Sequence, residues 1–313
     1  MVRAAAVQLV AVPGDISANL AACERLADEA GRAGAKIIAL PEFFSTGIGF
    51  LDQLADAALP FDGAATALLC RVARRFEALV GGSFLCRDGD GQVRNAYLLA
   101  DATGVLGRHD KDLPTMWENA FYIGGHDDGV LTAGAYRIGA AVCWELMRTR
   151  TVRRLRGRVD LVMTGSGWWS VPKWLPHSVF ARLERRNAAT ARNAAATFSR
   201  YVGAPVVHAG HAGELACPMP WLPVSYRGHF EGATMIVDAD GTVLAERRRE
   251  DGEGIVQAEI EPGSRRPELV APERFWLHRR GVVPTAAWHY QRWHGRRWYR
   301  ANVVIDSTTS RAR

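Results

Sequence analysis

Residues 136–143 read YRIGAAVC, an apolar run that ends in a cysteine. The run has the composition of a buried β-strand, and an arginine-rich stretch from Arg148 to Arg156, which we expect to be helical, follows it. A strand, a sharp turn and a helix would lift the Cys143 side chain out of a sheet and direct the first amides of the turn at the same point. This arrangement suits nucleophilic attack on a carbonyl carbon. A single buried cysteine is more often inert packing, so the prediction depends on other residues.

Two further residues favour a catalytic role for Cys143. Glu42 follows a second apolar run, KIIALP at positions 36–41, in which Pro41 cannot donate a ladder hydrogen bond and marks the strand's limit. Lys111 is one of only three lysines among 39 basic residues. Arginine's planar, delocalised charge does not replace a compact ammonium aimed at one developing oxyanion. The composition therefore indicates that lysine is needed at position 111, and chance retention is the alternative.

Apolar runs and helical patterns alternate along the chain, as they do in sheets covered by helices. We expect strands at residues 3–10, 36–40, 79–86, 93–101, 136–142, 159–164, 204–209, 232–237, 242–246 and 254–260. We expect helices from about Ser17, the predicted N-cap, and at residues 64–77, 148–156 and 177–201. A long loop holding Lys111 and Glu118 would precede the strand at 136–142. No internal repeat or low-complexity linker interrupts the pattern, which predicts a single domain with a C-terminal extension.

Composition narrows the class of protein. The apolar fraction of 48% is typical of a globular chain, and no uncharged apolar run of about 18 residues is present to span a membrane. The first residues read as a strand and not as a secretory signal. Five scattered cysteines without CxxC pairing favour a reducing, cytoplasmic location.

Three motifs in this order resemble the nitrilase superfamily of carbon-nitrogen hydrolases. They are AVQL at positions 6–9 leading to PE at 41–42, then KDLPT at 111–115 with Glu118, and then Gly139 through CWE at 143–145. The resemblance covers most of residues 3–261. It implies an α/β fold, the four-layer αββα sandwich of the nitrilase type, with residues 1–270 as the hydrolase domain and residues 271–313 as a C-terminal arm and tail.

The resemblance also implies a Glu-Lys-Cys triad. Glu42 would accept the thiol proton of Cys143, and Lys111 with the backbone amide of Trp144 would hold the tetrahedral anion. The acyl group would remain on sulfur as a thioester until water releases the acid, and neither a metal nor an organic cofactor is required. Glu118 matches the family's second glutamate, which would hold the Lys111 ammonium, although a solvated loop carboxylate is the alternative.

The substrate class stays open between three activities. The CWE and KDLPT segments lean toward the nitrilase branch, but LMRT at 146–149 departs from that branch's usual continuation. Small-amide hydrolysis demands less of the site, so we rank amidase first, nitrilase second, and an acyltransferase using the same thioester as a further alternative. Trp168 and Trp169 lie where the family's acyl pocket is usually lined, and ordinary core packing is their alternative role.

The remaining motifs give weaker expectations. His208 and His211 lack an HExxH helix or a carboxylate cluster, so we expect no metal site. Arginines interleave with aromatics over residues 275–300, a pattern that can stack on single-stranded nucleic acid. We expect instead an arm packed on the body or on a partner subunit of a homodimer or larger homo-oligomer, next to the partner's residues 148–156. Residues after Asp306 are expected to form a frayed tail.

Overall fold

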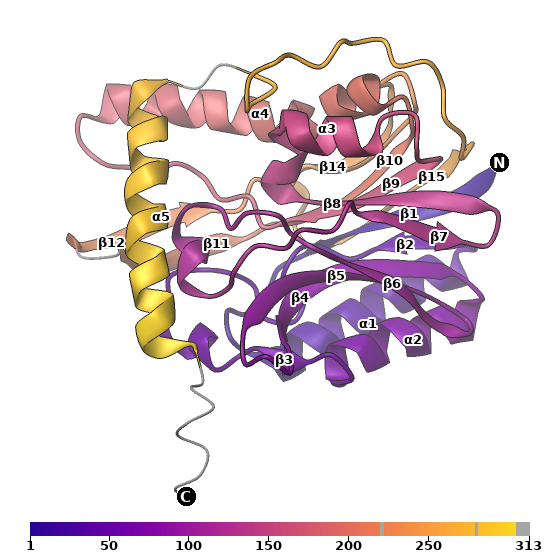
Figure 1. The fold of residues 1–313 in the computed structure, drawn as a ribbon, viewed down its shortest axis with the longest axis horizontal. Helices are drawn as coiled ribbons and strands as arrows, with labels where there is room; N and C mark the ends of the chain where they lie inside the picture. The colour runs from indigo at the N-terminus through magenta and orange to yellow at the C-terminus, as the bar shows by residue number, and fades with distance from the viewer. Residues whose placement is uncertain (220–221, 279–280, 305–313) are drawn as a thin grey trace, which may run out of the picture.

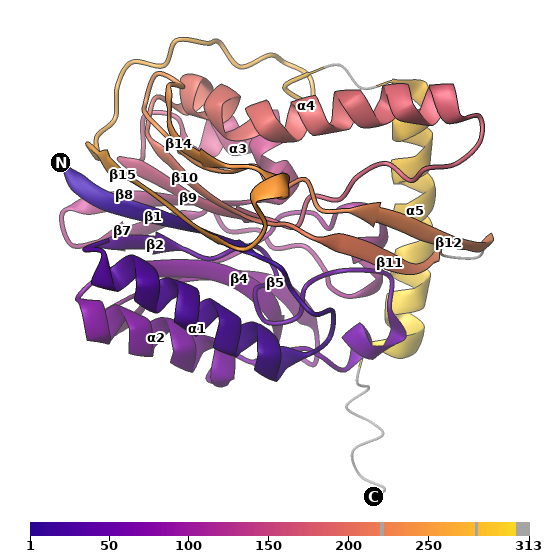
Figure 2. The same ribbon diagram turned by 180° about the vertical axis from the view of Figure 1, so that it is seen from behind.

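Two β-sheets lie face to face at the centre of the fold, and helices cover their outer faces (Figure 1). The computed structural model describes residues 1–219, 222–278 and 281–304, so the tail expected after Asp306 lies outside the described residues. Figure 2 shows the same four layers from behind. The predicted αββα sandwich is confirmed. None of the described helices combines the length and apolarity needed to cross a membrane.

The first sheet has the strand order β6-β5-β4-β2-β1-β15. Its strands are β1 (Val2–Leu9), β2 (Ile37–Ala39), β4 (Leu79–Arg87), β5 (Val93–Asp101), β6 (Gly104–Asp110) and β15 (Gly254–Ile260), and the short β3 (Leu59–Pro60) pairs with β4. Helices α1 (Ile16–Arg32) and α2 (Ala64–Phe76) cover its outer face. The central strands are apolar without alternation because both of their faces are buried.

The second sheet has the order β7-β8-β9-β10-β13-β14. Its strands are β7 (Val130–Ala133), β8 (Tyr136–Val142), β9 (Leu161–Ser166), β10 (Val206–His211), β13 (Thr234–Val237) and β14 (Val243–Arg247). Helices α3 (Thr149–Leu155) and α4 (His177–Val202) lie on its outer face. β1 and β10 join the two sheets through a short parallel pairing, so these 13 strands form one hydrogen-bonded sheet that folds into two layers.

Parallel pairing brings the carboxyl ends of the central strands to one edge of the sandwich. β8, β9, β10, β1, β2 and β4 are parallel in succession. The loops that follow these ends therefore meet at that edge, where α/β sheets commonly place their functional groups. Three short turns complete this region, namely η1 (Asp52–Ala55), η2 (Met116–Ala120) and η3 (Cys143–Met147). The region also contains the hairpin of β11 (Glu214–Met219) and β12 (Leu222–His229). A fourth short turn, η4 (Arg249–Asp251), precedes β15.

Helix α1 begins two residues earlier than predicted. Asp15, not Ser17, is the N-cap, and its carboxylate accepts a hydrogen bond from the Ala18 amide at 2.9 Å. A carboxylate at this position also interacts favourably with the positive end of the helix dipole. The long loop predicted before residue 136 was wrong in part, because β6, η2 and β7 lie within it.

The C-terminal arm contains a helix of 21 residues, α5 (Val282–Asn302), which the sequence analysis did not predict. Pro284 lies in its first turn, where the missing amide breaks no helical hydrogen bond. The helix stands along one edge of the sandwich and packs against η2 (Figure 1). Before α5, the Thr149 amide donates to the Phe275 carbonyl at 3.1 Å and the Leu277 amide to the Met147 carbonyl at 2.9 Å. The arm thus contacts the segment around Arg148 within one chain.

Candidate active site

Four predicted site residues converge where β2, β6 and β8 end. Glu42 follows β2, Lys111 follows β6 directly, Cys143 begins η3 after β8, and Glu118 lies in η2. Glu42, Lys111 and Glu118 are fully buried, and Cys143 is 1% exposed. Reactive groups held this far from bulk water interact more strongly with one another than they would at the surface.

Three donors fix both oxygens of the Glu42 carboxylate. Lys111 Nζ donates to Glu42 Oε1 at 2.7 Å, and Asn95 Nδ2 donates to the same oxygen at 2.8 Å. The Gly167 amide, just beyond β9, donates to Oε2 at 2.8 Å. Neither Asn95 nor Gly167 was predicted from the sequence. A polar residue in the apolar run of β5 was the available signal for Asn95, whereas a backbone donor such as Gly167 leaves no mark in the sequence.

Glu118 is the second carboxylate on Lys111. Lys111 Nζ donates to Glu118 Oε2 at 2.7 Å, and the same oxygen accepts from the Thr115 amide at 2.8 Å and from the Tyr122 hydroxyl. Burial raises the pKa of Glu118 to about 7, although Lys111 opposes that rise. Burial would lower the pKa of Lys111, but the charges of Glu118 and Glu42 outweigh it and hold that pKa well above its usual value. The ammonium is therefore kept charged, as an oxyanion partner must be.

Glu118 Oε1 is buried and has no hydrogen-bond partner among the residues that the structure describes. A buried acceptor without a partner is costly, and such atoms are concentrated where a ligand or an ordered water completes the site. The alternative of a solvated loop carboxylate for Glu118 was wrong, because this side chain is fully buried.

The backbone is strained at or near three of the four site residues, Glu42, Glu118 and Cys143. Phe43, next to Glu42, and Met116, in the turn that carries Glu118, have φ of 52°, and Cys143 itself has φ of 53°. Each is a non-glycine residue in the left-handed region, which costs roughly 1–3 kcal/mol and occurs preferentially at functional sites. At Cys143 this conformation produces the sharp turn between β8 and η3 that the sequence predicted.

The Cys143 thiol holds its proton at rest. Burial raises its pKa well above the ordinary cysteine value, the nearby negative charge of Glu42 raises it further, and Lys111 only partly offsets these effects. Since the thiolate and not the thiol is the nucleophile, attack requires a base at the sulfur. Glu42 is the carboxylate whose charge acts most strongly on this thiol.

A second hydrogen-bond network connects the turn at Cys143 to the segment that follows Lys111. The Glu145 carboxylate accepts from the Val142 amide at 2.7 Å and from the Asp112 amide at 3.1 Å, and it lies 2.9 Å from His109 Nε2. The other ring nitrogen of His109 lies 2.5 Å from Asp127 Oδ1. Burial lowers the pKa of His109, but Glu145 and Asp127 outweigh it and raise that pKa to about 9. The sequence analysis quoted Glu145 within a motif but gave it no role.

The predicted tryptophans flank the site. Trp168 is 5% exposed, its indole nitrogen donates to Asn187 Oδ1 at 2.9 Å, and its ring centroid lies 6.1 Å from that of Trp144. Trp169 stacks on Trp117, next to Glu118, with centroids 4.5 Å apart. Trp144 is the second residue of η3. The oxyanion role of its amide and the substrate-binding roles of Trp168 and Trp169 stay predictions.

The histidines weighed as metal ligands contact protein groups instead. His208 Nδ1 lies 2.9 Å from the Ala233 carbonyl, and its Nε2 lies 3.0 Å from Ser166 Oγ. His211 Nε2 lies 2.6 Å from the Glu42 carbonyl oxygen, so this ring supports the backbone beside the site.

One other cluster has the composition of a metal site. Glu184, His229 and Glu231 offer ligand atoms within 4.8 Å of one another. The Arg249 guanidinium contacts His229 Nε2, so this nitrogen already has a protein partner.

Comparisons with known proteins give one consistent family. The family model for carbon-nitrogen hydrolase matches residues 3–267. The nitrilase of Pyrococcus abyssi (strain GE5 / Orsay) is 26% identical over 160 residues, which are 50% of this chain, and the chain spans 60% of that nitrilase's length. The 2-oxoglutaramate amidase of Bacillus subtilis (strain 168) is 24% identical over 237 residues, which are 72% of this chain and 78% of that enzyme.

A solved structure shares the fold. A variant of the amidase from Nesterenkonia sp. AN1, which shows the Michael addition of acrylamide at its active-site cysteine, matches with a TM-score of 0.60 and 22% identity. The match covers 83% of this chain and 93% of that one. At this identity, the similarity supports a common fold.

Proposed function

Because this chain belongs to the carbon-nitrogen hydrolase family, as its motifs predicted, we propose that it hydrolyses a small amide through a thioester on Cys143. The observation that carries the proposal is the buried ion pair of Glu42 and Lys111, 2.7 Å apart, beside a cysteine at a strained turn. A base, a fixed positive charge and a nucleophile are the three groups that acyl transfer from an amide needs.

The proposed acylation begins with proton transfer from the Cys143 thiol to Glu42. Sulfur attacks the amide carbon, and the negative charge that develops on the carbonyl oxygen is held by the Lys111 ammonium and the Trp144 amide. Glu42 returns the proton to the leaving nitrogen, the carbon-nitrogen bond breaks, and ammonia departs. The acyl group is left on sulfur as a thioester.

Deacylation uses the same carboxylate. Glu42 accepts a proton from water as the hydroxyl attacks the thioester carbon, the carbon-sulfur bond breaks, and the proton passes to the thiolate. We propose that Glu118 positions the substrate nitrogen or the water, because its free Oε1 and its hydrogen bond to Lys111 place an acceptor beside the reacting groups. Trp168 and Trp169 are proposed to line the acyl pocket.

An ammonia-release screen tests the reaction. Purified protein is incubated with small aliphatic, aromatic and dicarboxylic monoamides and with the matching nitriles, and Cys143→Ala provides the blank. We expect ammonia and acid in equal amounts from at least one amide. Cys70→Ala, at a half-buried thiol outside the site, is the matched control and should keep full activity.

The same screen separates the alternatives. Turnover of nitriles but not of amides would favour the nitrilase activity for which the relative from Pyrococcus abyssi is named. If hydroxylamine is added and hydroxamate forms in place of the acid, the result would favour acyl transfer. Ammonia release that persists in Cys143→Ala would contradict the proposed nucleophile.

Thiol mapping provides an independent check of the nucleophile. Iodoacetamide should abolish turnover in step with the labelling of Cys143, as judged by peptide mass spectrometry. Loss of activity that follows labelling of any other cysteine would reject the assignment. The four others are Cys23, Cys70, Cys86 and Cys217, and all five cysteines are free thiols, which supports the proposal of a reducing, cytoplasmic location.

A further inference from the structure

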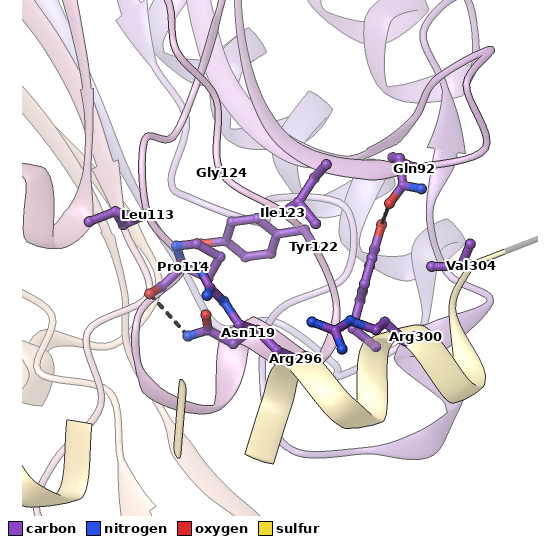
Figure 3. A pocket seen from close by; sticks show the side chains of 11 residues that line it. Gln92, Leu113, Pro114, Asn119, Tyr122, Ile123, Gly124, Arg296, Arg300 and Val304 are labelled. Atoms are coloured by element: carbon purple, nitrogen blue, oxygen red, sulfur yellow. Dashed lines mark hydrogen bonds between the residues drawn. The ribbon is translucent and has the colours of Figure 1, made fainter. Parts of the chain in front are cut away.

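A cavity of about 440 Å³ lies between α5 and the loop that carries Glu118 (Figure 3). Leu113, Tyr122 and Ile123 border it on the body, and Arg296 and Arg300 project into it from α5. Its volume is in the range of small-molecule binding sites. Among the described residues that line it, none is Glu42, Lys111 or Cys143, so this is a space beside the reacting groups and not the thiol site itself.

The cavity is positively charged. Arg296 and Arg300 are four residues apart on one face of α5, and neither forms an ion pair with an acidic residue in the described part of the chain. Like charges at this spacing destabilise a helix, so the pair has an unfavourable interaction that a bound anion would remove. By contrast, the guanidinium carbons of Arg292 and Arg297 lie 5.5 Å and 5.2 Å from the ring centroids of Trp288 and Trp293.

A neutral donor faces the same space. The Tyr299 hydroxyl donates to Gln92 Oε1 at 2.9 Å, which orients the amide so that Nε2 is the end left for a ligand. Gln92 Nε2 has no protein partner within the described ranges. No aspartate or glutamate is among the described residues that line the cavity.

Apolar side chains form another part of the wall. Leu113, Ile123, Val304 and the ring of Tyr122 line the cavity opposite or beside the arginines. A cavity with an apolar wall and a few convergent donors is suited to a ligand with a carbon body and one charged end. Inorganic phosphate alone would leave most of the volume unfilled.

We propose that this cavity binds a small organic anion, with its carboxylate or phosphate group between the guanidinia of Arg296 and Arg300. Guanidinium forks bind both of these groups in bidentate fashion, and the Gln92 amide would supply a further donor. The carbon body of the ligand lies against Leu113, Ile123 and Tyr122.

Such a ligand would contact residues that hold Glu118 and its turn in place. The Tyr122 hydroxyl donates to Glu118 Oε2, and Asn119 Nδ2, on another wall of the cavity, donates to the Met116 carbonyl at 2.8 Å. The bound anion therefore packs on the loop that holds the second carboxylate of the site. The inference is independent of the proposed amidase activity, since it concerns residues outside the triad.

Calorimetric titration tests the proposal on the full-length protein. The probes are phenylacetate and phenyl phosphate at constant ionic strength, with benzyl alcohol as the neutral analogue. We expect saturable binding of at least one anion and none of benzyl alcohol in the same concentration range. The tighter of the two anions identifies the acidic group, carboxylate or phosphate, that the cavity prefers.

Two double variants locate the binding. Arg296→Gln with Arg300→Gln should weaken the anion by about tenfold or more, because charge-assisted hydrogen bonds are lost. Arg292→Gln with Arg297→Gln removes the same charge from the same helix outside the cavity and should leave the affinity unchanged. Melting temperatures without ligand check the folding of both variants. If the Arg296→Gln, Arg300→Gln variant has a lowered melting temperature, Arg296→Lys with Arg300→Lys replaces it. The lysine variant keeps the charge but loses the bidentate guanidinium, and it should still bind the anion more weakly than wild type. Equal affinity in both doubles, or no saturable binding of either anion to the wild-type protein, would overturn the proposal.

Discussion

Glu42 and Lys111 form an ion pair that water cannot reach, and Lys111 has Glu118 as a second carboxylate partner. Lys111→Ala would leave two carboxylates buried without their cation, whereas Glu42→Gln would leave Lys111 paired with Glu118 alone. We expect Glu42→Gln and Lys111→Ala each to lower kcat by at least about a hundredfold, as when a general base or an oxyanion donor is removed. Steady-state kinetics on the best amide of the screen measure the loss, and circular dichroism checks the fold.

Lys111→Arg is the sharper test of the ammonium. The side chain must contact Glu42 and Glu118 in a fully buried space, where the wider guanidinium cannot occupy the same point. We expect a loss of activity similar to that of Lys111→Ala. Lys36→Arg is the matched control, since Lys36 is exposed and its ammonium donates to the Phe76 carbonyl at 2.8 Å. Retention of most activity in Lys111→Arg would remove the oxyanion role from this residue.

His109 gives the stability of the protein a defined pH dependence. Its pKa is raised to about 9 in the folded state, against about 6.5 in an unfolded chain. The resulting stabilisation, up to about 3 kcal/mol, is fully present below about pH 6.5 and is lost as the pH rises through about 9. The difference in unfolding free energy between wild type and His109→Gln should therefore shrink across this window. Urea denaturation at several pH values measures it, and a difference that stays constant would show that the imidazole is not charged at neutral pH.

At the scale of residues, the sequence located the proposed reacting groups but not most of the residues that hold them. Cys143 and Glu42 were predictable because a strand ended at each, and Lys111 stood out because the chain otherwise uses arginine. Asn95, His109 and the Gly167 amide act through contacts between residues far apart in the chain, and no local pattern reports such contacts.

Helix α5 packs against η2, the turn that carries Glu118, and its close approach depends on one glycine. A Cβ atom at Gly295 would lie 2.7 Å from Asn119 Cβ and 2.8 Å from the Ala120 amide nitrogen. Alanine normally stabilises a helix relative to glycine, by up to about 1 kcal/mol, but here the added methyl would meet the backbone of η2. We expect Gly295→Ala to destabilise the protein by about 1–3 kcal/mol, as overpacking does, and to lower kcat because Glu118 belongs to η2. Thermal unfolding and steady-state kinetics measure the two effects.

Gly263→Ala is the control for this substitution, since nothing lies within 4 Å of a Cβ atom at that position. It should leave both the melting temperature and kcat close to the wild-type values. If Gly295→Ala behaved in the same way, α5 would not be fixed against η2, and the cavity between them would lose its defined shape.

The elements that the sequence predicted are those with a strong hydrophobic period. The central strands, α1, α2 and the second half of α4 each bury an apolar face, so their positions follow from the pattern. β6 reads GVLGRHD and is only partly buried, so its pattern resembles a loop. α5 carries a proline in its first turn and aromatics on several faces, which conceal the period of an amphipathic helix.

At the scale of the whole molecule, the C-terminal arm packs against the body of its own subunit. Leu277, Trp288 and Tyr299 are buried against the body of the same chain, and the Arg148 guanidinium carbon lies 5.9 Å from the centroid of the Trp276 ring. We expected this arginine to contact aromatic residues of a partner subunit, but it contacts an aromatic residue of its own subunit. The division into residues 1–270 and an arm from residue 271 stays a proposal, as does the subunit contact.

We nevertheless propose that part of the arm contacts a second copy of the chain. Phe275, Tyr290 and Trp293 are 45%, 42% and 52% exposed, and large exposed aromatics on one segment form an adhesive patch that soluble proteins commonly bury in an interface. Light scattering should therefore report at least twice the chain mass of 34.3 kDa. Deleting residues 275–313 should give unstable or aggregating protein, whereas deleting only residues 305–313 should leave the assembly intact.

A substitution separates assembly from folding, because deletion of the arm also removes contacts within the subunit. Phe275→Glu with Trp293→Glu places charges at two exposed positions and should lower the measured mass to that of one chain without a large change in melting temperature. Val243→Glu, at a position on β14 that is 41% exposed, is the control and should leave the mass unchanged. A wild-type protein that is monodisperse and monomeric at micromolar concentration would contradict the proposed assembly. The arginine and aromatic side chains of the arm would then have to be tested against single-stranded nucleic acid by fluorescence anisotropy, since stacking on bases is the other use of this composition.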